Sequence, residues 1–312
     1  MNIKIRVGIT SFGSNTAIGV AKVLRFFYRN IEIIGIDSNS IDETTGHTFA
    51  DYFHQVPLAS KSSEYQDALN QIINHRKISV LIPIHDLELM TLSKNLKEIN
   101  CKVAVNSEQT IEICNDKLKA NQYASKFTKV PNHGIEEISR NTPVIIKSID
   151  GVGSKDIKVK EECLGEKVPK GFFWQDFISG QEYTVDCYRS YIDDEFFAYP
   201  RVRLETKGGI ATKSVGVNNA ELKAISKSIL EDLGYRGVAN IQFIENNGEY
   251  FFIEINPRFA GSGILAYSSG LNAPFWTIQE LLGYQVDFNQ VKLDYEKKMI
   301  RFFNEVFYAI NP

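Results

Sequence analysis

Polar side chains interrupt an apolar strand pattern between Gly237 and Arg258. The second half of this stretch reads Phe252-Ile-Glu-Ile-Asn-Pro-Arg258, and strand alternation places Phe252, Glu254 and Asn256 on one face. A buried carboxylate is unfavourable unless a cation meets it. Because oxygen ligands two residues apart suit a hard cation, we predict that Glu254 and Asn256 bind Mg²⁺. An edge hairpin whose polar face meets water is the alternative.

The turn of this predicted hairpin decides whether Gln242 joins the two ligands. A three-residue turn over 246–248 places Gln242 opposite Phe252, on the face of Glu254. A two-residue turn at Asn247-Gly248 places Gln242 on the other face. Both turns are sterically reasonable, so the sequence leaves the register open.

A second candidate site is Lys147 with the glycine-rich run Gly151-Val-Gly153-Ser154 that follows it. Lys147 interrupts the apolar strand expected over 143–149, so its ammonium must reach solvent or meet an anion. Glycines let main-chain N–H groups approach a phosphate closely. The combination predicts a phosphate clamp, and an ordinary glycine-rich hairpin is the alternative.

A third candidate is the aromatic stretch from Trp174 to Asp186, broken at Ser179-Gly180. Its backbone could hold a flat base, and the carboxylate of Glu182 could hold a ribose. Two strands joined by a loop, without a ligand, is the alternative.

The elements that must position these residues fall into two patterns. Apolar runs at 3–10, 31–37 and 80–83 alternate with helices, which predicts a parallel sheet with helices on both faces and ligands at the strands' carboxyl ends. Beyond Asn106, Asp116 is expected to cap a helix through Lys126, and aromatic strands from Phe172 onward predict an antiparallel sheet. The predicted fold class is therefore α/β followed by α+β.

Composition narrows the choice of partner. A chain of 312 residues is expected to form more than one compact unit, since single cores rarely exceed roughly 250 to 300 residues. A net charge of -3 argues against nucleic-acid and anionic-membrane binding, and no apolar run approaches the roughly 18 residues of a membrane span. Four cysteines without a CxxC pair predict reduced thiols in a cytoplasmic protein with small-molecule partners.

Taken in order, these pieces resemble the ATP-grasp superfamily, and most closely the branch of the carbamoyl phosphate synthetase large subunit, biotin carboxylase and the pyrrolysine-pathway ligase. The resemblance runs over Lys117, Lys147 with its glycine loop, Gln175-Asp-Phe-Ile-Ser-Gly-Gln-Glu182, Gln242 and Phe252 to Arg258. It implies a Rossmann-like N-terminal lobe over 1–110 and an ATP-grasp domain over 111–312. That domain divides into a small lobe at about 129–178 and a larger lobe at about 179–312.

The resemblance also implies the role of each candidate residue. Nucleotide binding falls to Lys117 and Lys147 for the phosphates, to Gly151, Gly153 and Ser154 as a loop over them, to Gln175, Asp176, Phe177 and Ile178 for adenine, and to Glu182 for ribose. Metal binding falls to Gln242, Glu254 and Asn256, which are implied to hold one or two Mg²⁺, or Mn²⁺ in their place. Arg258 and Arg203 are implied to stabilise the transferred phosphoryl group and the acyl phosphate.

The function implied is an ATP-dependent ligase that joins a carboxylate to an amine through an acyl phosphate and releases ADP. Relatives often form homodimers through the amino-terminal lobe. A kinase that stops at phosphoryl transfer and a nucleotide-binding regulator without turnover remain alternatives. A dinucleotide-dependent oxidoreductase is a further one, because glycines between Gly8 and Gly19 precede Asp37, although they do not follow GxGxxG. Asp86 is expected to cap the helix beginning at Leu87, and Glu88 to favour its positive first turn, rather than to bind metal.

Overall fold

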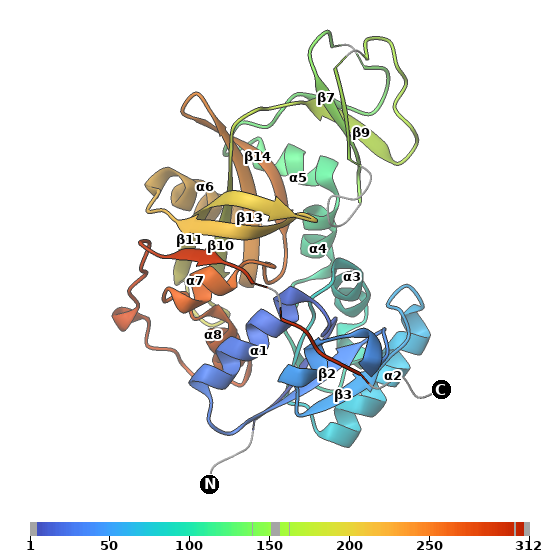
Figure 1. The fold of residues 1–312 in the computed structure, drawn as a ribbon, viewed down its shortest axis with the longest axis vertical. Helices are drawn as coiled ribbons and strands as arrows, with labels where there is room; N and C mark the ends of the chain where they lie inside the picture. The colour runs from blue at the N-terminus through green and yellow to red at the C-terminus, as the bar shows by residue number, and fades with distance from the viewer. Residues whose placement is uncertain (1–4, 139, 151–156, 162, 303, 309–312) are drawn as a thin grey trace.

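The computed structural model describes residues 5–138, 140–150, 157–161, 163–302 and 304–308. Gly151, Gly153 and Ser154, which are predicted to cover the phosphates, lie outside these residues. The described chain forms three separate sheets, one parallel and two antiparallel, stacked along the long axis of the molecule (Figure 1). The predicted α/β and α+β class is therefore confirmed.

The first sheet is parallel, with strand order β3-β2-β1-β4-β5. Its strands are β1 (Ile5–Ile9), β2 (Ile31–Asp37), β3 (Tyr52–Gln55), β4 (Val80–Ile82) and β5 (Lys102–Val103). Helices of this region are α1 (Asn15–Phe27), α2 (Ser62–Arg76), α3 (Asp86–Lys94) and α4 (Glu108–Asn115). Every residue of β2 is buried, as expected for a parallel strand covered on both faces. The chain reverses its winding between β1 and β4, which is where ligands bind in such sheets.

The second sheet has six antiparallel strands in the order β14-β13-β10-β11-β12-β15. Its strands are β10 (Gln181–Arg189), β11 (Phe196–Lys207), β12 (Ile210–Gly216), β13 (Gly237–Asn246), β14 (Glu249–Asn256) and β15 (Lys298–Ile300). The helices that accompany it are α5 (Lys117–Ala124), α6 (Ala220–Asp232), α7 (Ile264–Ser268) and α8 (Ala273–Leu281). Asp116 caps α5 as predicted, because its carboxylate accepts the N–H groups of Leu118 and Lys119.

The third sheet is small, with order β6-β9-β7-β8, and it lies at the far end of the molecule from the parallel sheet (Figure 1). Its strands are β6 (His133–Gly134), β7 (Val144–Ser148), β8 (Lys158–Lys160) and β9 (Phe172–Asp176). The aromatic strand β9 pairs with β7 here rather than with β10. The expectation that all aromatic strands from Phe172 onward share one sheet is therefore wrong, because the chain leaves the small sheet after Asp176.

One hydrophobic core joins the parallel sheet to the six-stranded sheet. It contains Val7 of β1 and Ala17 of α1 together with Tyr188 of β10 and Trp276 of α8, all buried. Because these buried apolar side chains come from both sheets and from the helices that cover them, their packing holds the two sheets together. Among the described residues, no helix combines the length and the apolar composition needed to cross a bilayer.

Candidate functional site

The β13–β14 hairpin combines the two registers that the sequence left open. Asn246 pairs with Glu249, so the turn has two residues, and the positive φ angles of Asn247 and Gly248 (53° and 81°) suit it. A bulge at Ile253 then shifts the register, so that Phe243 faces Phe252 but Gln242 faces Glu254. The bulge, rather than a longer turn, brings Gln242 to the face of Glu254.

The same bulge corrects the predicted position of Phe252. Phe252 is 1% exposed and packs in the core beneath the sheet with Ile255, so it does not share a face with Glu254. One extra residue inverts the alternation, and apolar burial decides which side each residue takes. The remaining polar face carries Gln242, Glu254 and Asn256, all partly buried.

Glu254 is the centre of this polar face. Its Oε1 accepts hydrogen bonds from Gln242 Nε2 at 2.7 Å and from Asn256 Nδ2 at 3.0 Å. Both bonds from described residues go to the same carboxylate oxygen. The three predicted metal ligands are therefore in contact with one another, as residues that bind the same ion must be. The donor set comprises one carboxylate and two amides, and no cluster of three or more His, Cys, Asp or Glu side chains occurs among the described residues.

Arg203 of β11 joins the metal candidates to the predicted ribose residue. Its Nη1 donates to Gln242 Oε1 at 2.6 Å, its Nη2 donates to Gly209 O at 2.8 Å, and its Nε lies 3.2 Å from Glu182 Oε2. Burial lowers the pKa of Arg203, while the nearby carboxylates Glu182 and Glu254 raise it. Arg203 thus faces the site.

Two basic neighbours of Arg203 form ion pairs away from the predicted site. Arg201 is buried in an ion pair with Asp186, with Nε 2.7 Å from Oδ2. Lys213 pairs with Glu205 at 2.6 Å on the exposed hairpin. Of Arg201, Arg203 and Lys213, Arg203 is therefore the one whose contacts lead to the predicted site.

Arg258 ties the polar face to the parallel sheet. Its Nε donates to Asp86 Oδ1 at 2.7 Å, and its Nη2 donates to Asp86 Oδ2 at 3.2 Å and to Asn256 Oδ1 at 3.1 Å. The prediction that Asp86 caps a helix starting at Leu87 is wrong. The helix begins at Asp86 itself, and His85 is the cap, accepting the N–H of Leu87. Asp86 is instead the carboxylate partner of Arg258.

Lys147 of β7 lies within electrostatic range of the polar face although it belongs to another sheet. Its side chain is buried, and burial lowers its pKa to about 8; Glu254 opposes this shift and Lys117 adds to it. Lys147 therefore lies within electrostatic range of the Glu254 carboxylate on one side and of a second cation, Lys117, on the other. A pair of like charges held together in this way favours an anion between them.

Gln175, near the end of β9, has a buried oxygen without a hydrogen-bond partner among the described residues. This atom is Oε1, and the residue is 3% exposed. The N–H groups of Asp176 and Phe177 are engaged, donating to Asn132 O at 2.8 Å and Pro143 O at 3.0 Å. A buried acceptor without a partner is unfavourable unless a ligand supplies the donor.

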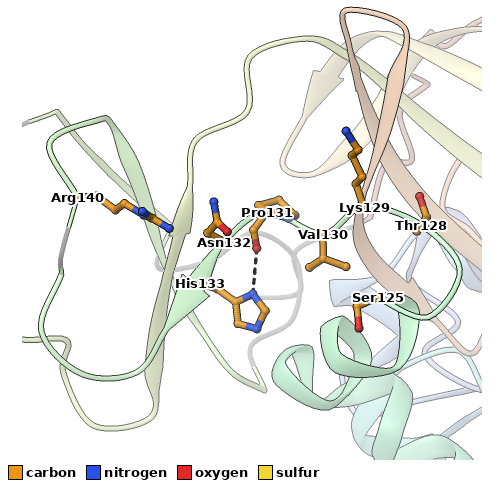
Figure 2. A pocket seen from close by; sticks show the side chains of 8 residues that line it. All are labelled: Ser125, Thr128, Lys129, Val130, Pro131, Asn132, His133 and Arg140. Carbon is orange, nitrogen blue, oxygen red and sulfur yellow. Dashed lines mark hydrogen bonds between the residues drawn. The ribbon is translucent and has the colours of Figure 1, made fainter.

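The segment over residues 128–133 fixes the small sheet relative to the hairpin. Phe252 N donates to Lys129 O at 2.8 Å, whereas Asp176 N donates to Asn132 O at 2.8 Å. This linker borders an open hollow of about 750 Å³, whose lining contains none of the predicted ligands (Figure 2). The hollow is lined by Ser125, Thr128, Lys129, Val130, Pro131, Asn132, His133 and Arg140.

The carboxylate that suggested a dinucleotide site has an internal role. Asp37 is 5% exposed; its Oδ2 accepts the N–H of Gly13 at 2.7 Å, and its Oδ1 accepts the N–H of Asn39 at 2.9 Å. Asp37 thus braces the turn after β1. These bonds give the carboxylate a structural role in this turn.

Comparison with known proteins gives results in agreement with this geometry. Residues 170–301 match the family model described as "ATP-grasp in the biosynthetic pathway with Ter operon". The large chain of carbamoyl phosphate synthase from Clostridium perfringens (strain 13 / Type A) is 24% identical over 263 residues, covering 74% of this chain and 24% of that protein. The chain thus spans about a quarter of that relative's length.

Two solved structures share the fold. N5-carboxyaminoimidazole synthetase from Staphylococcus aureus, complexed with ADP, aligns with a TM-score of 0.72 at 16% identity, over 94% of this chain and 81% of that one. The biotin carboxylase domain dimer of Hydrogenobacter thermophilus 2-oxoglutarate carboxylase, in complex with MgADP, ADP and bicarbonate, aligns with a TM-score of 0.73 at 12% identity, over 92% and 72%.

Proposed function

We propose that the chain is a member of the ATP-grasp superfamily and acts as an ATP- and Mg²⁺-dependent ligase that joins a carboxylate to an amine. The single observation that carries the proposal is that Lys147, buried in the small sheet, lies within electrostatic range of Glu254 on the hairpin and of Lys117. Cations on one side and oxygen donors on the other are what a metal-bound triphosphate requires. The ADP and MgADP complexes of structurally similar proteins support the choice of nucleotide.

The nucleotide would lie between the small sheet and the hairpin. Gln175 Oε1 would accept a hydrogen bond from the exocyclic amine of adenine. Because Asp176 and Phe177 use their N–H groups internally, the main-chain contact to the base falls to Ile178. Glu182, whose side chain is 51% exposed, would hold the ribose, and the two lysines would neutralise the phosphates.

The donor set fits a magnesium ion once both amides turn. Gln242 and Asn256 now direct their N–H groups at Glu254 and their oxygens at Arg203 and Arg258, respectively. Rotating each amide would present three oxygens to one cation, and Mg²⁺ held by Gln242, Glu254 and Asn256 would supply positive charge to offset that of the phosphates. The same rotation would free one N–H group of Arg203 and one of Arg258 to stabilise charge on the phosphoryl group, while Asp86 would still hold Arg258 in place.

The proposed reaction has two balanced steps. A carboxylate oxygen of the substrate attacks the γ-phosphorus of ATP, the bond to the β–γ bridging oxygen breaks, and ADP leaves. The amine nitrogen then attacks the carbonyl carbon of the acyl phosphate, inorganic phosphate leaves, and the nitrogen loses a proton. Water must be excluded between the steps, because it would hydrolyse the acyl phosphate.

The remaining expectations belong to the same proposal. We propose the N-terminal lobe over 1–110, the ATP-grasp domain over 111–312 with its lobes at about 129–178 and 179–312, a homodimer and a cytoplasmic location. The number of metal ions, one or two, and use of Mn²⁺ are left to titration with each ion.

A screen of amino acids and small carboxylates for stimulated ADP release tests the function. The Glu254→Ala variant should lose two to three orders of magnitude, roughly, in Mg-ATP turnover because it removes the carboxylate of the metal site. Glu221→Ala, an exposed change in the first turn of α6, is the matched control and should retain full turnover. Full activity in Glu254→Ala would refute the proposal.

Mass spectrometry of the products separates the ligase from its rivals. A product that combines both substrates, formed with one ADP, supports the ligase. A phosphorylated product alone would identify a kinase, and ATP binding without ADP would identify a regulator.

A further inference from the structure

Arg258, which follows β14, is held by a carboxylate from the parallel-sheet region. Its Nε lies 2.7 Å from Asp86 Oδ1 and its Nη2 lies 3.2 Å from Asp86 Oδ2, although the two residues are 172 apart in sequence. Paired N–H···O bonds of this kind fix the plane of a guanidinium as well as its position. Asp86 therefore sets the direction in which the rest of the Arg258 guanidinium faces.

The ion pair is buried, and the backbone holds both partners. Asp86 is 7% exposed and is the first residue of α3, directly after the cap His85. The carbonyl of Arg258 accepts a hydrogen bond from Asn240 Nδ2 at 3.0 Å. Burial acts to lower the pKa of Arg258, but Asp86 and Glu254 raise that pKa above its usual value. Arg258 is therefore a charged side chain with a fixed orientation.

Asp86 leaves one edge of this guanidinium for other ligands. It takes the N–H groups on the Nε side, whereas an arginine carries further donors on Nη1 and Nη2. Of these, Nη2 contacts Asn256 Oδ1 at 3.1 Å, and Nη1 lies at the long distance of 3.4 Å from Phe259 O. The edge opposite Asp86 thus points towards the proposed metal site, and it can bind an oxyanion once the Asn256 amide turns to the ion.

We propose that Asp86 is a positioning residue for phosphoryl transfer. By holding the Nε side of Arg258, it aims the opposite edge at the γ-phosphoryl group while the substrate oxygen bonds to phosphorus, the bond to the β–γ bridging oxygen breaks, and ADP leaves. Asp86 acts through Arg258 rather than by contact with the nucleotide. The inference rests on the proposed ATP-dependent function, and it applies equally to the kinase alternative, because both reactions transfer the same group.

The Asp86→Asn variant keeps the size of the side chain but removes its charge and one acceptor oxygen. A guanidinium that can turn should lower kcat for ADP release by about ten- to a hundredfold, because small misplacements of a charge-stabilising group slow a reaction strongly. The KM for ATP, and the Kd for Mg-ATP measured by calorimetry, should stay within about threefold. The matched control is Asp67→Asn, the same change at an exposed position of α2, which should alter none of these quantities.

A purely electrostatic role for Asp86 gives a different result. Loss of a negative charge beside the site would strengthen the binding of the anionic nucleotide and leave kcat unchanged. Tighter Mg-ATP binding with an unaltered kcat in Asp86→Asn would therefore contradict the inference.

A double-mutant cycle with Arg258→Gln tests whether Asp86 acts through Arg258. In the Arg258→Gln background, whose kcat is already reduced, Asp86→Asn should change kcat by less than about twofold, because the side chain that Asp86 positions is absent. A further fall of about tenfold in that background would show that Asp86 acts independently, and the inference would then be wrong.

Asp86→Glu keeps the test decisive if Asp86→Asn does not fold, since removing one partner of a buried ion pair is strongly destabilising. This variant retains the charge and moves the carboxylate by the length of a methylene group. It should fold, bind Mg-ATP normally and lower kcat by about fivefold. A folded Asp86→Glu protein with an unchanged kcat would show that the aim of Arg258 does not depend on Asp86.

Failure of the proposed function gives a separate result. If the unaltered protein releases no ADP with any carboxylate or amine, the inference falls together with the proposed function. If it releases ADP and Asp86→Asn behaves like Asp67→Asn, only the role of Asp86 is refuted.

Discussion

Glu254 of the antiparallel sheet and Glu88 of the parallel-sheet region are both glutamates beside the interface of the sheets, yet their surroundings differ. Glu88 is 7% exposed and accepts hydrogen bonds from Thr10 Oγ1 at 2.6 Å and from His85 N at 2.9 Å. Burial raises its pKa, and these bonds oppose the shift. Glu254 is more exposed and receives two amides on one oxygen, with Lys147 nearby.

The difference separates a structural carboxylate from one suited to a ligand. The partners of Glu88 are donors fixed by the backbone and by a neighbouring strand, so this carboxylate has its hydrogen bonds without a ligand. The partners of Glu254 are side-chain amides that can present oxygen as well as N–H, and its environment is cationic. A carboxylate with exchangeable partners is therefore better evidence for a metal site than a buried carboxylate alone.

The largest contrast should appear in stability. Glu88→Ala leaves the Thr10 hydroxyl and the His85 N–H without their acceptor in a buried place, so the free energy of unfolding should fall by about 3 kcal/mol. Glu254→Ala frees only two partly buried amides, and its free energy of unfolding should change by less than about 1 kcal/mol. Urea unfolding of both variants provides the measurement.

Metal-free conditions are needed for this comparison, since a bound ion would add stability to the unaltered protein alone. If Glu254→Ala proves as destabilising as Glu88→Ala, Glu254 belongs to the framework and the contrast between the two glutamates disappears.

Much of the fold follows from local sequence patterns. Apolar runs predicted β1, β2 and β4, and the Asp116 cap predicted the start of α5, because these depend on neighbouring residues. The polar face of Glu254 and Asn256 follows from strand alternation in the same way. The order of the motifs then indicated the superfamily, since each weak signal constrains the others.

The failures have a common cause, which is dependence on distant contacts. Asp86 pairs with Arg258 across 172 residues, whereas its position just before the expected helix gave a sufficient local explanation as an N-cap. The bulge at Ile253 depends on core packing of Phe252 against Phe243, which alternation alone does not reveal. The unpartnered Oε1 of Gln175 likewise becomes visible only once the small sheet is assembled.

The cation near Glu254 gives a second prediction, intermediate in size. Lys147 has a pKa of about 8, so it loses its proton as the pH rises through that value. Nucleotide affinity should then weaken by up to about tenfold per pH unit above pH 8, because an uncharged amine no longer neutralises phosphate. Binding of ATP followed by calorimetry from pH 7 to 9.5 provides the measurement.

Raising the pH should weaken nucleotide binding, but it should increase the contribution of Lys147 to the free energy of unfolding. Between about 8 and the usual value of 10.5, the unfolded chain holds more protons on Lys147 than the folded chain does, so this group's contribution to stability rises with pH. Lys147→Arg is the control for both effects, since a guanidinium stays charged throughout. Persistence of the same pH dependence in that variant would assign it to another group.

The smallest change in stability is expected from adding a second carboxylate beside Glu254, which increases the difference between its surroundings and those of Glu88. Gln242→Glu places a second carboxylate directly opposite Glu254, and without metal this like-charge pair should lower the free energy of unfolding by about 1 kcal/mol. Mg²⁺ should reverse the loss and raise the melting temperature more than it does in the unaltered protein, because two carboxylates hold the ion more tightly. Asn247→Asp adds the same charge in the exposed turn, where Asp-Gly is tolerated, and should not change the response to Mg²⁺. Equal responses in Gln242→Glu and Asn247→Asp would place the ion away from Glu254, and the contrast between the two glutamates would then concern hydrogen bonding alone.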